Sequence, residues 1–162
     1  MYRKAFITYI RPLVEYNCII WNPTHQHLID LLESVQRKFS KRIPNLSSLS
    51  YPDRLAKLDL ESLELRRLRF DLLIYHNILH SLTPLHAKDY FLIYYPPSSS
   101  RSVMPYLQQP IKATSKLSSS FFYRNIHAWN SLPCALRSVS SKTSFKTLLK
   151  KVDLTKFLKG KF

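Results

Sequence analysis

Apolar residues recur every three or four positions along much of the chain, and this spacing predicts a mainly α-helical protein. The first such segment covers residues 2–17. Its helical face is formed by Phe6, Ile10, Leu13 and Tyr16. Pro12 lies within the segment, and because proline lacks an N–H and its ring clashes with the preceding turn, we expect a kink or a break there. The first element is therefore predicted to be a kinked helix.

Three further helices are predicted before residue 95. Residues 25–43 carry an apolar stripe of Leu28, Leu32, Val35, Phe39 and Ile43, widened by Leu31. A short helix is expected after Ser50, which can act as its N-cap with Pro52 in the first turn. The longest helix, about 62–81, has a predicted buried face of Leu65, Leu68, Leu72, Tyr75, Leu79 and Leu82. Together these segments predict a helical bundle over residues 1–95.

Residues 96–120 differ in character from the rest of the chain. They are rich in Ser and Pro and lack helical periodicity, so we expect an extended linker with a possible short β-hairpin around residues 103–111. Residues 121–162 are predicted to form two C-terminal helices, at 121–133 and 143–152, followed by a basic tail. The predicted domains are thus 1–95, 96–120 and 121–162.

Charge narrows the range of partners. The 162 residues include 25 Lys and Arg against 10 Asp and Glu, giving a formal net charge of +15. Such a charge repels itself in a compact fold unless polyanions neutralise it, so nucleic acid is the first partner to consider. A merely basic surface is the main alternative. No apolar run reaches the roughly 18 residues of a membrane span, and no secretory signal is present, so we expect a cytoplasmic or nuclear protein that is neither secreted nor membrane-bound.

No catalytic constellation is visible in the chain. The acidic residues are scattered, and a single glycine, Gly160, excludes Gly-rich phosphate loops. His76 and His80 could share a metal ion, and Cys18 with His25 and His27 is a similar candidate. Both sets lack the spacing of a standard zinc site, so the favoured interpretation is that neither binds metal. We therefore predict no catalytic residue, no metal and no cofactor for this chain.

Clustered cations are the main candidates for a binding site. The predicted phosphate-binding residues lie on two of the predicted helices. They are Arg37, Lys38, Lys41 and Arg42 on the helix of residues 25–43, and Arg66, Arg67 and Arg69 on the helix of about residues 62–81. Contacts of this kind are independent of base sequence and strongly dependent on salt. Cations near a helix C-terminus also suit the helix dipole, so the first cluster has a structural explanation as well. Trp21 and Trp129 are interpreted as core anchors rather than base-stacking residues.

Four stretches of the chain resemble the region downstream of the palm in reverse transcriptases of non-LTR retrotransposons (LINE-type, jockey-like). "YIRPLVEYNCIIWNP" is similar to a motif carried here by Tyr9, Arg11, Pro12, Leu13, Glu15, Tyr16, Trp21 and Pro23. "LESVQRKFSKRI" and "YPDRLAKLDLESLELRRLRFDL" resemble the next two blocks. "FFYRNIHAWNSLP" matches a fourth through Phe121, Phe122, Arg124, Trp129, Asn130, Leu132 and Pro133. The resemblance covers nearly the whole chain, in order.

The resemblance implies a thumb-like, non-catalytic piece of an RNA-directed DNA polymerase. Its expected partners are the backbone of an RNA–DNA or RNA duplex and the palm and fingers of the parent polymerase. The catalytic aspartates and Mg²⁺ are expected only in that palm, and Met1 is expected to be an internal methionine of a longer element. Two alternatives stay open: a domesticated helical module that binds a protein partner, and a non-functional relic.

Overall fold

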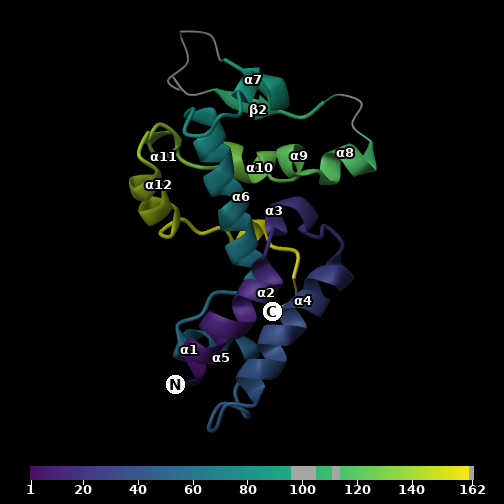
Figure 1. Ribbon diagram of the computed structural model, residues 1–162, viewed down its shortest axis with the longest axis vertical. Coiled ribbons are helices and arrows are strands. Elements are labelled where there is room, and N and C mark those ends of the chain that lie inside the picture. Colours follow the sequence, from purple (N-terminus) through teal and green to yellow (C-terminus); the bar gives the residue numbers. More distant parts are fainter. Residues whose placement is uncertain (96–104, 111–113, 161–162) are drawn as a thin grey trace. The chain divides into compact units, whose positions relative to one another are not determined.

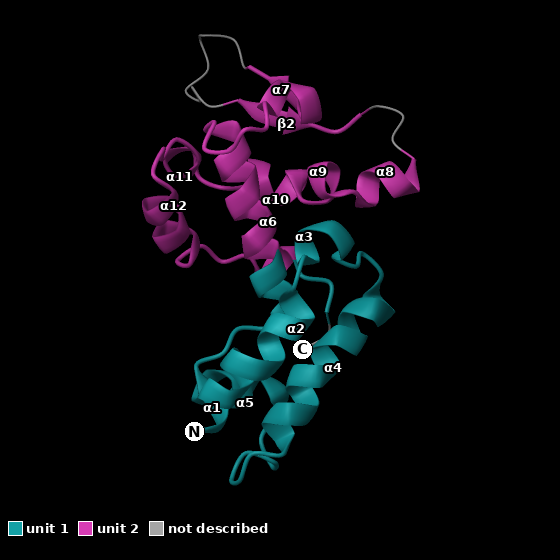
Figure 2. Cartoon of the chain, in the orientation of Figure 1, with its two compact units in different colours: residues 1–67, 158–162 teal, residues 68–157 magenta. Residues whose placement is uncertain are grey.

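The computed structural model describes residues 1–95, 105–110 and 114–160, and it is mainly helical, as the sequence predicts (Figure 1). The chain forms two compact units (Figure 2). Unit 1 comprises residues 1–67 and 158–162, and unit 2 comprises residues 68–157. The boundary lies inside helix α6, Leu63–Leu79. The units thus differ from the predicted domains 1–95, 96–120 and 121–162.

Unit 1 begins with a helix that changes type before Pro12. It consists of α1 Tyr2–Ala5, the π-helical turn η1 Phe6–Ile10 and α2 Arg11–Glu15, and α3 Cys18–Trp21 follows. Proline cannot donate to the carbonyl of the preceding turn, and a π-helical turn widens the backbone where that bond is missing. The sequence predicted a kink or a break at Pro12, but the helix runs on through Pro12 and instead has a π-helical turn in the residues before it. Asn17, with a φ of 50°, separates α2 from α3.

Two helices and a set of buried apolar side chains complete unit 1. They are α4 Gln26–Lys41 and α5 Tyr51–Leu58. The side chain of Ser50 accepts a hydrogen bond from the Asp53 N–H at 3.3 Å, so the predicted N-cap of α5 is confirmed. The rings of Phe6 and Phe39 lie 5.0 Å apart, which joins η1 to α4. The buried apolar side chains of unit 1 are Phe6, Cys18, Ile29, Ile43, Leu46, Tyr51, Leu60 and Leu63.

The buried face of α4 differs from the predicted one. The positions that α4 buries are Ile29, Glu33, Gln36 and Ser40. Three residues of the predicted stripe are instead exposed, namely Leu28, Leu31 and Val35, and Leu31 is 65% exposed. The prediction was right for Ile43, which is buried, and wrong for these three. The reason is that the inward polar side chains of α4 are hydrogen-bonded to other parts of unit 1, which periodicity alone cannot reveal.

Unit 2 contains the C-terminal part of α6, a small sheet and several short helices. After α6 come α7 Ala87–Tyr90 and strand β1 Leu92–Tyr94, which pairs antiparallel with β2 Tyr106–Gln108 so that Ile93 faces Leu107. The hairpin was expected within residues 103–111. Its described part pairs with β1 instead, while Val103, Met104 and Ile111 lie outside the described residues, as do residues 96–102, 112 and 113 of the predicted linker.

The C-terminal half of unit 2 is built from more and shorter helices than predicted. They are α8 Ser115–Ser119, α9 Phe121–Arg124, α10 Ile126–Asn130, α11 Cys134–Arg137, α12 Lys142–Leu149 and the 3₁₀ turn η2 Thr155–Phe157. Tyr75 of α6 lies at the centre of an aromatic cluster, with ring centroids 5.0 Å from Phe91 and 5.2 Å from Phe121. Trp129 is buried against Tyr75 and Phe145, so its predicted role as a core anchor is confirmed.

Candidate nucleic-acid interface

The C-terminal turns of α4 present a group of exposed cations. Lys38, Lys41 and Arg42 are all exposed, and among the described residues no carboxylate forms an ion pair with any of them. Arg37 is different, because its guanidinium lies over the ring of Tyr51 at 5.2 Å. The structure therefore brings three of the four predicted α4 residues together at the surface, and it places Arg37 half-buried against α5.

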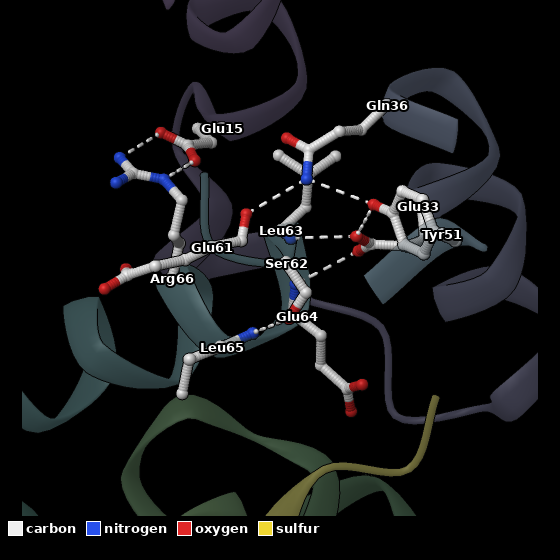
Figure 3. Close-up of polar contacts among 10 residues, drawn as sticks. All are labelled: Glu15, Glu33, Gln36, Tyr51, Glu61, Ser62, Leu63, Glu64, Leu65 and Arg66. Carbon is white, nitrogen blue, oxygen red and sulfur yellow. Dashed lines mark hydrogen bonds and ion pairs between the residues drawn. The ribbon is translucent and has the colours of Figure 1, made fainter. Parts of the chain in front are cut away.

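Buried polar contacts determine which face of α4 is exposed (Figure 3). The Glu33 carboxylate accepts hydrogen bonds from the backbone N–H groups of Leu63 and Glu64, at 3.1 and 3.3 Å, and from the Tyr51 hydroxyl. It therefore caps the first turn of α6, where unpaired N–H groups and the helix dipole favour an anion. Burial raises the pKa of Glu33, and the hydrogen bonds partly oppose that shift.

Gln36 completes this buried network. Its side-chain amide donates to the Tyr51 hydroxyl at 3.1 Å and to the backbone carbonyl of Glu61 at 3.0 Å (Figure 3). One turn further on, the hydroxyl of Ser40 accepts from the Arg54 guanidinium at 3.1 Å. These contacts hold α4 against α5 and the start of α6. The rotation of α4 that they impose turns Lys38, Lys41 and Arg42 outward.

The arginines of α6 do not form a matching exposed face. Arg66 makes a two-pronged ion pair with Glu15, in which one pair of atoms is 2.9 Å apart (Figure 3). Arg67 is completely buried, with its Nε 3.0 Å from the side-chain oxygen of Asn22. Burial lowers the pKa of the Arg67 guanidinium, and the nearby carboxylate of Glu33 opposes that shift. Arg69 donates to the backbone carbonyl of Lys150 at 3.3 Å.

Several residues of the resemblance motifs make defined structural contacts. Asn130 forms two hydrogen bonds with the backbone of Leu107, 3.0 and 2.8 Å long, and so fastens α10 to strand β2. Pro133 is the N-cap of α11. Glu15 pairs with Arg66, as described, and burial together with the charge of Arg66 lowers the pKa of the half-buried Arg11. These positions serve the fold, which agrees with their interpretation as structural motif residues.

Other motif residues lie at the surface of unit 1. Tyr9 and Tyr16 are exposed, and Pro23 is half-buried. Trp21 is 40% exposed, with its indole N–H donating to the backbone carbonyl of Tyr16 at 2.6 Å. The interpretation of Trp21 as a core anchor is therefore wrong. A Trp-x-Pro spacing gives no information on burial, because tryptophan is common both in cores and at surfaces.

The histidine pairs are engaged in other contacts. The Nε2 atoms of His76 and His80 lie 2.6 and 2.8 Å from the backbone carbonyls of Val139 and Arg137. The rings of His25 and His27 stack 6.0 Å apart. Within residues 1–95, 105–110 and 114–160, no group of three or more His, Cys, Asp or Glu side chains is arranged to hold a metal ion.

Unit 2 carries exposed cations that the sequence analysis did not select. On and after α12 these are Lys142, Lys146, Lys150 and Lys151. The signal available in the sequence was the recurrence of lysine every four residues, which places Lys142, Lys146 and Lys150 along one side of a helix. The cations of residues 37–42 and 66–69 stand closer together in the sequence and so give a stronger local signal.

Comparisons with known proteins give one similarity. An uncharacterized protein of Caenorhabditis elegans is 39% identical over 82 residues, which cover 49% of this chain and 41% of that protein. The match thus spans about two fifths of the relative's length. No family model and no solved structure matches the chain. None of the helices in the described part of the chain is both long enough and apolar enough to cross a membrane.

Proposed function

We propose that the chain binds the backbone of duplex nucleic acid through the C-terminal turns of α4. The observation that carries this proposal is the outward display of Lys38, Lys41 and Arg42, none of which forms an ion pair with a carboxylate among the described residues. With a net charge of +15, the chain as a whole also attracts polyanions. Binding of this kind neutralises phosphates and does not read bases.

The proposed biological setting is that of a non-catalytic, thumb-like part of a retrotransposon reverse transcriptase, acting in the cytoplasm or nucleus. The support for this setting is the resemblance of the four sequence stretches. The preferred duplex would be RNA–DNA or RNA, and polymerisation with Mg²⁺ would belong to the palm of the parent enzyme. Arg66 and Arg67 are left out of the proposed interface, because one is paired with Glu15 and the other is buried.

The test is a triple substitution on α4. Lys38→Gln/Lys41→Gln/Arg42→Gln should weaken binding of a labelled RNA–DNA duplex in fluorescence anisotropy. The slope of log K against log salt concentration should become shallower by up to about 3, since each lost phosphate contact removes about 0.9. Far-UV circular dichroism should be unchanged, because the substituted side chains face solvent.

A matched control separates a local interface from general charge. Lys4→Gln/Lys57→Gln/Lys88→Gln removes the same number of positive charges from exposed positions outside the last turns of α4. This control should keep most of the affinity and the original salt slope. Equal losses in the two triple variants would show that no particular face of α4 binds the duplex, and the proposal would then be wrong.

A second candidate function is contact with a protein, and it is favoured by apolar side chains exposed on unit 1. On α4 these are Leu28, Leu31 and Val35, and before α4 they are Tyr9, Leu13, Tyr16 and Ile20. Contiguous apolar surface of this kind is typical of protein contacts. The occupant expected from the resemblance is the palm of the parent polymerase. Without it the chain should self-associate in size-exclusion chromatography, and Leu13→Gln/Leu31→Gln should restore a monomer. A wild-type chain that elutes as a monomer would count against this candidate.

A further inference from the structure

Helix α12 is held in a defined orientation in unit 2. Phe145 and Leu149, one turn apart, are buried, and the ring of His76 stacks on that of Phe145 with centroids 4.1 Å apart. The Ser141 hydroxyl accepts from the Ser144 N–H at 3.4 Å and caps the N-terminus of the helix. At the other end, Arg69 donates to the carbonyl of Lys150. The outward face of α12 is therefore fixed within this unit.

That outward face is a row of lysines. The α12 row consists of Lys142, Lys146 and Lys150, which recur every four residues, and of Lys151 beside Lys150, and all four are exposed. With a rise of ~1.5 Å per residue, successive members are ~6 Å apart along the helix axis. Phosphates on one strand of duplex DNA repeat every ~3.4 Å along its axis. Successive lysines of the row thus match phosphates about two nucleotides apart.

Acidic residues are scarce in the sequence around the row. Residues 138–157 contain a single acidic residue, Asp153. Its carboxylate accepts hydrogen bonds from the N–H and the hydroxyl of Thr155, at 2.9 and 2.7 Å, and these bonds lower the pKa of Asp153. Among the described residues, no carboxylate forms an ion pair with the four lysines of the row. Their charges are therefore directed to solvent.

Helix stability does not account for this arrangement. Lys142 is the first residue of α12, directly after its N-cap. A cation at that end is opposed by the helix dipole, which favours anions at the N-terminus and cations only in the last turn. The dipole therefore explains Lys150 but not Lys142. The continuation of the row to the N-terminal end is instead what contact with an extended polyanion requires.

We propose that α12 forms a second surface for the phosphate backbone of duplex nucleic acid, made of Lys142, Lys146, Lys150 and Lys151. The inference rests on the proposed function, because it assumes the same class of ligand, but it concerns a different unit and different residues. It replaces the second cationic surface that the sequence placed on α6. Each unit then carries its own cationic helix.

The test compares two quadruple variants of the full chain. Lys142→Gln/Lys146→Gln/Lys150→Gln/Lys151→Gln removes the α12 row. Lys4→Gln/Lys57→Gln/Lys88→Gln/Lys116→Gln removes the same charge from exposed positions elsewhere. The α12 variant should bind an RNA–DNA duplex at least tenfold more weakly than the control variant, with a salt slope shallower by up to about 3 to 4. Its thermal midpoint should stay nearly level, because the loss of Lys142, which the helix dipole opposes, offsets the loss of Lys150, which the dipole favours.

The α4 triple variant makes the outcomes distinguishable. If it loses affinity while the α12 variant behaves like its control, the α12 inference is overturned and the proposed function stands. If the α12 variant loses affinity and the α4 variant does not, the α12 surface stands and the assignment to α4 falls. If neither differs from its control, or if the wild type binds vesicles rich in anionic lipid but no duplex, both are overturned.

Chemical footprinting gives a readout that needs no variant. Acetylation of lysines with an amine-reactive reagent, followed by mass spectrometry, reports the accessibility of each side chain. Bound duplex should protect Lys146, Lys150 and Lys151 at least threefold relative to Lys88 and Lys116. Equal labelling of all five lysines with and without duplex would contradict the inference.

Discussion

Arg124 holds Asp71 by a two-pronged ion pair inside unit 2. The guanidinium donates to both carboxylate oxygens, at 2.7 and 2.8 Å, and the side-chain amide of Asn125 donates to one of them at 2.6 Å. Both partners are almost entirely buried. This contact joins α6 to α9 across 53 residues of sequence.

Removal of one partner should therefore be costly. Asp71→Leu leaves the Arg124 guanidinium buried without its anion, and we expect a loss of about 3–5 kcal/mol in the free energy of unfolding. The double variant Asp71→Leu/Arg124→Met should lose less than the sum of the two single losses, since no unpaired charge remains. Urea unfolding followed by Trp129 fluorescence, in a Trp21→Phe background, measures both. If the loss of the double variant equals the sum of the two single losses, the ion pair between Asp71 and Arg124 contributes no coupling energy.

An exposed ion pair provides the control for that series. Arg3 and Asp59 form an ion pair of 2.7 Å in unit 1, and the Asp59 side chain is almost fully exposed. Asp59→Asn should change the free energy of unfolding by less than about 1 kcal/mol. Asparagine also tolerates the positive φ of 48° at this position.

The buried Glu33 predicts a specific pH dependence. Burial raises the pKa of Glu33 above its ordinary value of 4.5, so the folded state holds this proton more tightly than the unfolded state does. Its contribution to stability is thus fully present below pH 4.5 and declines as pH rises through the folded pKa. The advantage of the wild type over Glu33→Gln should shrink from pH 4.5 to pH 8 in urea titrations. An advantage that grows over this range would show that the pKa of Glu33 is lowered instead.

The hydroxyl of Tyr51 should contribute to the stability of the buried network around Glu33. It donates to the Glu33 carboxylate inside unit 1. Tyr51→Phe keeps the ring beneath Arg37 and removes both this donor and the acceptor of the Gln36 amide. A loss of about 1.5–3 kcal/mol is expected, because the hydrogen bond is made to a charged and buried group. Urea unfolding followed by circular dichroism checks this value, and a loss below about 0.5 kcal/mol would mean that the carboxylate is satisfied without Tyr51.

The orientation of α4 can be tested by two substitutions two residues apart. Ile29→Ala should cost about 2–5 kcal/mol, because Ile29 is buried in unit 1. Leu31→Gln should change the free energy of unfolding by less than about 0.5 kcal/mol, because Leu31 is largely exposed. The apolar stripe predicted from the sequence would instead bury Leu31, and Leu31→Gln would then cause a large loss in the free energy of unfolding. Thermal and urea unfolding of the two variants decide between the two orientations.

The same helix shows how far the sequence could predict this fold. Periodicity located α4, and Ser50 located the start of α5, because both signals are local. The inward direction of Glu33 was not predictable, since it depends on the N–H groups of Leu63 and Glu64, which lie 30 and 31 residues away. A polar residue in an amphipathic pattern is ordinarily assigned to the surface. Here a helix N-terminus makes its burial favourable.

The candidate site follows the same rule. Sequence clustering identified Lys38, Lys41 and Arg42, which the structure leaves exposed and without an ion pair to any carboxylate among the described residues. It could not predict that Arg66 faces Glu15, 51 residues away, or that Arg67 is buried. The density of charge along the sequence thus identifies candidate binding residues, but the long-range contacts of each cation determine whether its side chain is exposed to solvent.

His76 should make unit 2 sensitive to mild acid. Burial lowers the pKa of His76 below its ordinary value of 6.5, and the neighbouring His80, with ring centroids 4.4 Å apart, lowers it further, while the hydrogen bond to Val139 opposes the shift. The unfolded state then binds the proton more readily, so stability present above pH 6.5 is lost as pH falls. His76→Leu should remove this loss between pH 7.5 and 5.5, as followed by Trp129 fluorescence. His127→Gln, a change at an exposed position of the same unit, should leave it intact. A loss of equal size in both variants would assign the acid sensitivity to another group.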